Sequence, residues 1–176
     1  MVLPSRQQTF EAAVLPHLDA AFNLARWLMR NAPDAEDVVQ EAIVRALTYY
    51  RGFRGDNPRA WFLQIVRNVA YGALNTARAP AGTDNNSEGA LAELPDHADG
   101  PDVQLMKKED RCRVQKLLAD LPIDLCETLV LREFEDLSYK DIARITDTPI
   151  GTVMSRLWRA RRMIAEGLHR EGHIHD

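Results

Sequence analysis

The side chains of this chain that are best suited to chemistry lie close together near its C-terminus. They are basic, hydroxyl-bearing, aromatic and thioether groups at helical spacing: Met154, Ser155, Arg156, Trp158, Arg159 and Arg162. Arginine can donate two hydrogen bonds to a guanine edge, and serine can bond to a base edge or a phosphate. Residues 154–165 contain four arginines and no acidic residue, so a helix there would present a basic face. Such a face is either ordinary solvated surface or a contact for nucleic acid.

Two helices joined by a tight turn must position that basic face. Ser138, with Asp141 three residues later, is typical of a helix start, because the hydroxyl can accept a free backbone N–H. The sequence DTP at 147–149 then ends this first helix. The second helix has one apolar face at spacings of three and four, which we expect to point inward: Val153, Leu157, Ala160, Ile164 and Leu168. This pattern favours a helix-turn-helix over 138–168, and with it DNA binding.

The same segment carries a family resemblance. Residues 137–143 (LSYKDIA) and 149–161 (PIGTVMSRLWRAR) resemble region 4.2 of the extracytoplasmic-function, or group 4, sigma factors of bacterial RNA polymerase. The resemblance implies that the second helix enters the major groove of the −35 promoter element. It assigns the −35 contacts to the six residues named first, with Arg162 expected to meet phosphate.

A predicted helix that begins near residue 34 has an acidic outer face. Its inward face would hold seven apolar residues: Ala35, Val38, Val39, Ala42, Ile43, Ala46 and Leu47. We expect Asp34 to cap this helix, and Asp37, Gln40 and Glu41 to point outward. Taken alone, these three side chains suit a solvated surface. Residues 34–41 (DAEDVVQE) also resemble sigma region 2.2, which implies that Asp37, Gln40 and Glu41 dock on the β′ clamp helices of core polymerase.

The next loop and helix interleave aromatic, amide and arginine side chains. These groups suit single-stranded DNA, because rings stack on bases, amides bond to base edges and cations meet phosphates. The alternative is that Trp61 and Tyr71 only close the core of the domain. The segment resembles sigma regions 2.3 and 2.4, which melt and read the −10 element. The residues implied in that contact are Arg51, Phe53, Arg54, Asn57, Trp61, Gln64, Asn68 and Tyr71. Residues 75–80 hold one arginine where many members carry a basic run, so phosphate contacts upstream of −10 are unsupported.

The composition and the missing motifs argue against several other classes of protein. Apolar residues make up 45% of the chain, the net charge is −4, and the long periodic segments all suit helices, which predicts an all-α fold. We find no glycine-rich phosphate loop, metal-ligand cluster or nucleophile with an adjacent base, so we expect no enzyme activity, no cofactor and no metal. Cys112 and Cys126 are expected to be plain thiols, and the role of the terminal His173 and His175 stays open. No stretch reads as a signal peptide or membrane span, which predicts a cytoplasmic protein without membrane insertion.

The chain is predicted to fold as two small helical domains joined by a flexible acidic linker. The proposed boundaries are 1–78 for sigma region 2, 79–103 for the linker and 104–176 for sigma region 4. The resemblance implies an RNA polymerase sigma factor that directs core polymerase to promoters. Its implied partners are core polymerase, through the β′ clamp helices and the β flap, promoter DNA, and an anti-sigma factor. The alternatives are a dimeric helix-turn-helix regulator and a sigma-mimicking interaction protein.

Overall fold

The computed structural model describes residues 6–77 and 101–172 of the chain. Within these ranges every regular element is helical, which confirms the predicted all-α fold. The C-terminal histidines and residues 79–100 of the predicted linker lie outside the described residues. The last three residues of that predicted linker, 101–103, are helical instead. The helix begins there because Pro101 has a fixed φ and no N–H to lose, which suits a first helical position.

The N-terminal half is a bundle whose first helical stretch is interrupted at Pro16. A short 3-10 segment at that proline separates α1 from α2, because proline cannot supply the N–H that a continuous helix needs. The elements of this half are α1 (Arg6–Val14), η1 (Leu15–His17), α2 (Leu18–Met29), α3 (Ala32–Tyr49), η2 (Tyr50–Gly52) and α4 (Pro58–Ala77).

The start of α3 corrects one prediction. The capping residue is Asn31 and not Asp34: the Asn31 side chain accepts a hydrogen bond from the Asp34 backbone N–H at 2.8 Å. Asparagine is as good a cap as aspartate, and this start places Pro33 in the first turn. At α4, the Asn57 side chain accepts the Ala60 N–H at 3.0 Å and caps the helix.

The inward face of α3 is narrower than the apolar pattern suggests. Ala35, Val39 and Ala46 are fully buried, whereas Leu47 is 55% exposed. The prediction that Leu47 points inward is therefore wrong. The small alanines of α3 allow close contact with the neighbouring helices. Because Ala46 makes this contact, the next residue, Leu47, faces solvent. Leu47 and Val44, which is 59% exposed, form an apolar strip on the outer side of α3.

The C-terminal half contains the predicted helix-turn-helix. Ser138 accepts the Asp141 N–H at 3.1 Å and donates to the Asp141 carboxylate at 2.9 Å, which fixes the start of the first helix. Asp147 ends that helix in the left-handed conformation with φ of 51°, a geometry that aspartate tolerates. The elements of this half are α5 (Pro101–Ala119), α6 (Ile123–Glu133), α7 (Tyr139–Thr146) and α8 (Ile150–Gly172).

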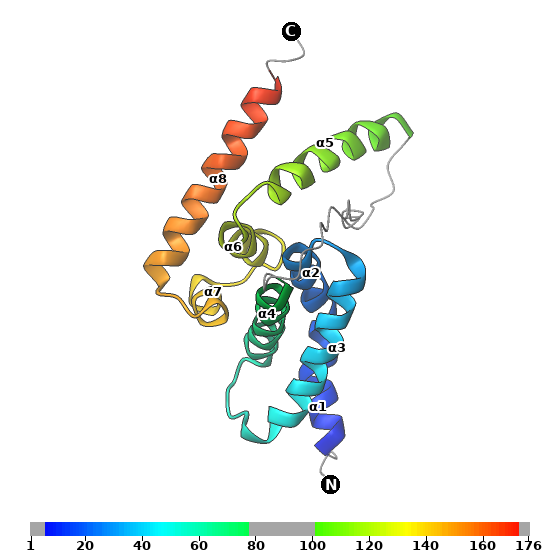
Figure 1. Ribbon diagram of the computed structural model, residues 1–176, viewed down its shortest axis with the longest axis vertical. Helices are drawn as coiled ribbons and strands as arrows, with labels where there is room; N and C mark the ends of the chain where they lie inside the picture. Colours follow the sequence, from blue (N-terminus) through cyan, green and yellow to red (C-terminus); the bar gives the residue numbers. More distant parts are fainter. Residues whose placement is uncertain (1–5, 78–100, 173–176) are drawn as a thin grey trace.

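The predicted inward face of α8 is confirmed over the first three turns of the helix, but the prediction is wrong at its end. Val153, Leu157 and Ala160 are buried, but Leu168 is 40% exposed. Gly167 packs there instead, against the Leu117 side chain of α5. A Cβ at position 167 would clash with the Leu117 side chain, so glycine lets α5 and α8 approach closely at this point. Beyond this contact the two helices diverge toward their free ends (Figure 1).

The two halves pack into one body, an arrangement that the sequence does not predict. Helix α4 lies against α7, and α2 lies against α6 (Figure 1). The buried apolar residues of both halves belong to one continuous cluster. Trp27 of α2 contacts Phe134 at the end of α6, with ring centroids 6.2 Å apart. The surface that joins the halves is therefore part of the core in this conformation.

The buried face of α8 yields a stability prediction. Leu157 is 1% exposed, so Leu157→Asp should lower the free energy of unfolding of the C-terminal half by about 3–5 kcal/mol, through a lost apolar contact and an unpaired buried charge. Urea unfolding followed by circular dichroism measures the change. The matched control is Leu47→Asp at an exposed leucine, which should cost less than about 1 kcal/mol. Equal losses at the two positions would contradict this assignment of buried and exposed faces.

Candidate functional site

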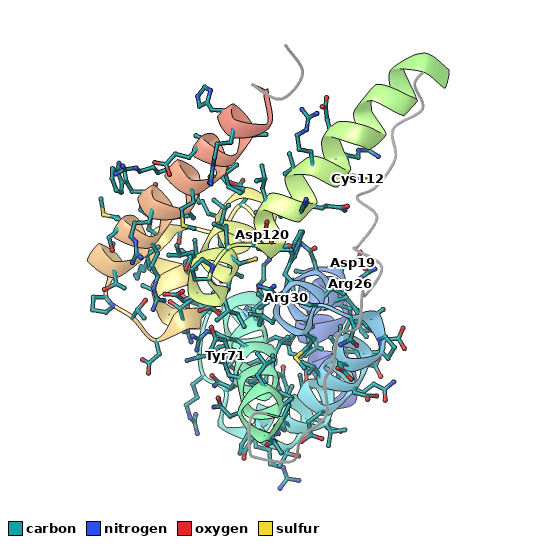
Figure 2. All side chains as sticks on the ribbon, turned by 45° about the horizontal axis from the view of Figure 1, so that its top comes forward. Asp19, Arg26, Arg30, Tyr71, Cys112 and Asp120 are labelled. Carbon is teal, nitrogen blue, oxygen red and sulfur yellow. The ribbon has the colours of Figure 1, made fainter. Side chains whose placement is uncertain are left out.

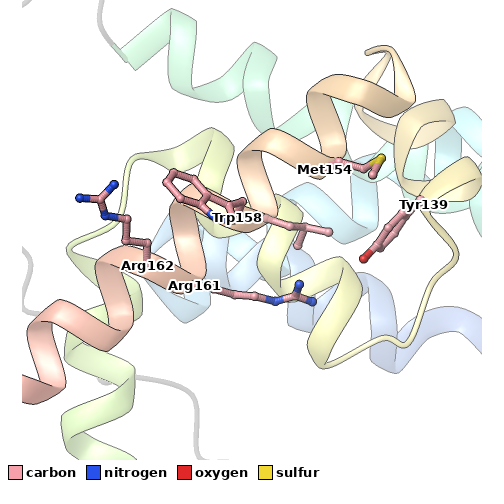
Figure 3. A pocket seen from close by; sticks show the side chains of 6 residues that line it. Tyr139, Met154, Trp158, Arg161 and Arg162 are labelled. Carbon is pink, nitrogen blue, oxygen red and sulfur yellow. The ribbon is translucent and has the colours of Figure 1, made fainter.

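The outer face of α8 presents most of the residues predicted to contact DNA. Met154 is 54% exposed and Trp158 is 61% exposed, and Ser155, Arg159 and Arg162 are also exposed. Figure 3 shows Met154, Trp158, Arg161 and Arg162 along this helix, with Tyr139 of α7 facing Met154 across a shallow pocket. Large apolar groups that stay exposed between arginines suit a surface that closes on a partner.

Neighbouring contacts hold parts of this face in place. The Arg162 guanidinium lies over the Trp158 ring at 5.3 Å, and its Nε donates to Glu166 at 2.8 Å. The Ser155 hydroxyl donates to the Thr152 carbonyl at 3.0 Å. All of these groups are solvent-exposed, so the contacts are weak enough to exchange for bonds to phosphate or base.

Arg156 lies differently from the other predicted DNA-contacting residues. Its side chain is 20% exposed and points toward α6, where Nε lies 3.4 Å from the Asp124 carboxylate. Its Nη1 is buried and has no hydrogen-bond partner among the described residues. Arg161 also turns to α6 and donates to Glu133 at 2.6 Å. In this conformation both arginines join α8 to α6.

The loop before α4 is built around an aromatic cluster. The rings of Phe53 and Trp61 lie 4.7 Å apart, and Tyr50 lies 6.2 Å from Phe53 and 6.1 Å from Trp61. Phe53 and Trp61 are each partly buried, and the flanking Arg51 and Arg54 are exposed. Trp61 thus packs against the core and is still partly accessible, so its position decides between neither of the two roles that the sequence left open.

Further along α4, the residues predicted to contact DNA differ in their exposure to solvent. Asn68 is exposed and Gln64 is partly buried, whereas Tyr71, labelled in Figure 2, is hydrogen-bonded to Glu127 of α6. The Arg67 guanidinium lies 4.3 Å from the Tyr71 ring centroid. Burial and the nearby Glu127 carboxylate raise the pKa of Tyr71, which is hydrogen-bonded to both Glu127 and Arg67. The Tyr71 hydroxyl is therefore engaged in hydrogen bonds within the protein in this conformation.

The acidic face of α3 lies where the sequence predicts it. Asp37, Gln40 and Glu41 are exposed, and Glu41 accepts a hydrogen bond from Arg45 at 2.7 Å. Asp37 and Glu41 stand on the rim of a groove of about 340 Å³, whose floor is apolar. The floor and rim are formed by Met29, Asp34, Val38, Val69, Ala73 and Ala77. An acidic rim over an apolar floor suits a basic amphipathic helix.

Sequence reasoning missed the polar contacts that join the two halves. Arg67 of α4 donates two hydrogen bonds to Glu127 of α6, at 2.8 and 3.0 Å. Glu135 accepts from Arg59 at 3.0 Å and from Asn23 at 2.6 Å. The available signal was Glu127 itself, an acid inside the mostly apolar run 125–131 (LCETLVL). A carboxylate placed there needs a buried cation.

The electrostatics of the Arg67–Glu127 pair reflect its burial. The Glu127 side chain is 0% exposed and that of Arg67 is 15% exposed. Burial raises the pKa of Glu127, while bonds from Arg67 and Tyr71 and the charge of Arg156 act in the opposite direction. Burial lowers the pKa of Arg67, but its bonds to Glu127 outweigh burial and the pKa is raised overall. The guanidinium therefore stays charged and is the main partner of Glu127.

Within 6–77 and 101–172 we find no group of three or more His, Cys, Asp or Glu side chains that could hold a metal ion. None of the helices in those ranges is long and apolar enough to cross a bilayer.

Comparison with known proteins decides the family. Residues 13–79 match the family described as Sigma-70 region 2, and residues 113–164 match Sigma-70, region 4. The RNA polymerase sigma-H factor of Pseudomonas aeruginosa is 35% identical over 168 residues, which cover 92% of this chain and 87% of that protein. The ECF RNA polymerase sigma-E factor of Haemophilus influenzae is 38% identical over 148 residues, which cover 80% of this chain and 77% of that protein. The chain belongs to the extracytoplasmic-function group of the sigma-70 family.

Solved structures also resemble this chain. A chain in the co-crystal structure of the sigma factor RpoE with the anti-sigma factor NepR from Bartonella quintana superposes with a TM-score of 0.74 at 29% identity, and the match covers 92% of this chain and 97% of that chain. The structure of CnrH in complex with the cytosolic domain of CnrY has a TM-score of 0.67 at 22% identity, which shows the shared fold. As an RNA polymerase sigma factor, the chain serves transcription initiation, with core polymerase and promoter DNA as its partners.

Proposed function

We propose that this sigma factor divides promoter recognition between its two halves. Residues 104–176 read the −35 element, and residues 1–78 bind core polymerase and open the −10 element. The observation that carries the proposal is the outer face of α8, where arginine, serine and tryptophan side chains stay exposed behind a capped helix-turn-helix. A face of this kind fits the major groove, which admits one α-helix.

At the −35 element the exposed side chains take different roles. Met154, Ser155, Trp158 and Arg159 meet base edges, and Arg162 meets phosphate at the end of the contact. Arg156 belongs to the same predicted set, but it reaches DNA only if it releases Asp124. The shallow pocket beside Trp158 gives the face an apolar part that can contact thymine methyl groups.

At the −10 element the aromatic cluster supplies the stacking surface. Phe53 and Trp61 form its accessible side, and Arg51, Arg54 and Asn57 flank it. Gln64, Asn68 and Tyr71 extend the contact along α4. Stacking on an aromatic ring contributes roughly 1–3 kcal/mol per base, which is enough to favour a base that has left the duplex.

Core polymerase meets the acidic face of α3. Asp37, Gln40 and Glu41 dock on the β′ clamp helices, with the apolar floor of the adjoining groove as a second contact. The C-terminal half docks on the β flap. Charged groups at such an interface speed the encounter and fix its register more than they add affinity.

We also propose how this sigma factor is regulated and that it is not an enzyme. The RpoE chain that resembles this one was crystallised with an anti-sigma factor, which supports an anti-sigma factor as a regulator here. The chain supplies promoter specificity and no catalysis, since polymerase makes the RNA, and it acts in the cytoplasm. A dimeric regulator and a sigma mimic are less well supported, because the family matches cover both the polymerase-binding half and the DNA-binding half.

The polymerase contact predicts a loss of binding after charge reversal. Asp37→Arg with Glu41→Arg should reduce co-purification with core polymerase at least ten-fold, since acids facing a basic surface become cations. The fold should be unchanged by circular dichroism, because both residues are exposed. The control is Asp19→Arg with Asp120→Arg, which makes the same charge change outside α3. Undiminished binding by the first variant would remove this surface from the assignment.

The −35 contact predicts two distinct signatures in holoenzyme. Arg159→Ala should weaken binding to the preferred promoter by about 1–3 kcal/mol and relax the preference at one or two base pairs. Arg162→Ala should weaken all sequences about equally and reduce the salt slope by about one. Binding to a set of single-base promoter variants at several salt concentrations separates the two. Unchanged base preference in Arg159→Ala would place the reading surface elsewhere.

The −10 contact predicts a defect in melting. Trp61→Ala should slow open-complex formation about ten-fold or more and leave closed-complex binding nearly unchanged, because the ring stacks only on unpaired bases. A template with a pre-melted −10 bubble should restore the rate. The control is Tyr49→Ala, which removes a ring that is 64% exposed. A lower unfolding midpoint with normal melting of DNA would show that Trp61 serves the core alone.

A further inference from the structure

Helix α8 carries an arginine on each edge of its buried stripe. Val153, Leu157 and Ala160 form the stripe and are buried. Arg156 lies three residues after Val153 and four before Ala160, whereas Arg161 lies four residues after Leu157. With 3.6 residues per turn, these spacings place the two arginines on opposite sides of the stripe.

The two arginines reach opposite ends of α6. The Arg156 Nε lies 3.4 Å from the Asp124 carboxylate in the first turn of α6. Arg161 donates to Glu133, the last residue of α6, at 2.6 and 3.1 Å. A roll of α8 about its own axis would lengthen one contact in either direction, so the two contacts together fix the roll. Apolar packing alone is less exact, because the angles between packed helices scatter by about 15–20°.

The Arg156 guanidinium has no open edge for a guanine base in this conformation. Bidentate bonding uses either the Nη1–Nη2 edge or the Nε–Nη2 edge. Nη1 is buried and has no hydrogen-bond partner among the described residues, and Nε faces Asp124. Ser155 and Arg159, by contrast, are exposed on the side of α8 away from the stripe. The contacts of Arg156 therefore suit support of α8 better than readout of a base.

The reach of Ser155 and Arg159 depends on the roll of α8. A side-chain tip about 6 Å from the helix axis moves by roughly 2 Å when the helix rolls by about 20°. Hydrogen bonds to a base edge hold over a range of only about 0.5 Å in length, so such a displacement breaks them. A contact that fixes the roll therefore also fixes which base edges α8 can bond.

We propose that Arg156 is a positioning residue for −35 recognition: through Asp124 it sets the roll of α8 so that Ser155 and Arg159 meet their bases, and it contacts no base itself. The proposal deepens the proposed function and rests on its assignment of α8 to the −35 element. Asp124 lies on α6, outside the set of residues predicted to contact DNA. An effect of this carboxylate on base preference must therefore pass through α8.

Substitution of Asp124 tests the proposal, because positioning and direct contact predict opposite results. Binding of holoenzyme is measured on the preferred −35 sequence and on its single-base variants at several salt concentrations. Asp124→Asn should lower the preference for the best sequence about three-fold or more, and Arg156→Gln should lower it at the same base pairs. The double variant should be no worse than either single variant, since each removes the same contact. If Arg156 contacted DNA directly, Asp124→Asn would release it and strengthen binding.

Two control variants isolate the ion pair. Asp120→Asn removes the same charge from an exposed aspartate before α6 and should leave base preference unchanged. Asp124→Glu keeps the carboxylate and should keep most of the preference. The salt slope should stay the same in Arg156→Gln, whereas loss of a phosphate contact would reduce it by about one.

Three results would overturn the proposal: unchanged or stronger binding by Asp124→Asn, a reduced salt slope in Arg156→Gln, or additive losses in the double variant. Asp124→Asn and Asp124→Glu decide the matter if Arg156→Gln does not fold, because the Asp124 side chain is 40% exposed. Failure of the proposed function is a separate result, since Arg159→Ala would then leave base preference unchanged.

Discussion

One buried ion pair, Arg67–Glu127, joins the two halves of this sigma factor. Arg67 and Glu127 come from different halves of the chain and meet in a largely buried position. Removing one partner of such a pair typically costs about 3–5 kcal/mol, because the other charge stays buried. The pair thus favours a single compact body, although each half has its own helices and its own contact surface.

The proposed DNA-contacting surfaces depend on local structural features such as helix caps and turns. The Ser138 cap and the left-handed Asp147 set the turn that aims α8 outward. The Asn57 cap starts α4 and brings Trp61 beside Phe53. Because each device acts within a few residues, the surfaces can stay intact when the halves separate. Rigid surfaces on separable bodies are what recognition of two distant DNA elements needs.

The sequence predicts these local features well and the contacts between halves poorly. Ser138, Pro16 and Asn57 act through backbone rules that operate within one turn, so their effects are readable from spacing alone. Leu47 and Leu168 were assigned inward and are exposed, because small neighbours, Ala46 and Gly167, make the close contact instead. The Arg67–Glu127 pair joins residues 60 positions apart, and no periodic pattern identifies such a partner. The predicted polymerase and DNA residues lie mostly on exposed faces, while Arg156 and Tyr71 face the interior of the closed body.

The distance between the two halves, before and after promoter binding, tests this account most directly. Fluorescent probes at Asn75 of α4 and Met163 of α8, both exposed, would report it by energy transfer in a chain carrying Cys112→Ser and Cys126→Ala. The account predicts one short distance in the free chain and a clearly longer one in the open complex, because each half then binds its own promoter element. The same short distance in both states, with transcription intact, would contradict it.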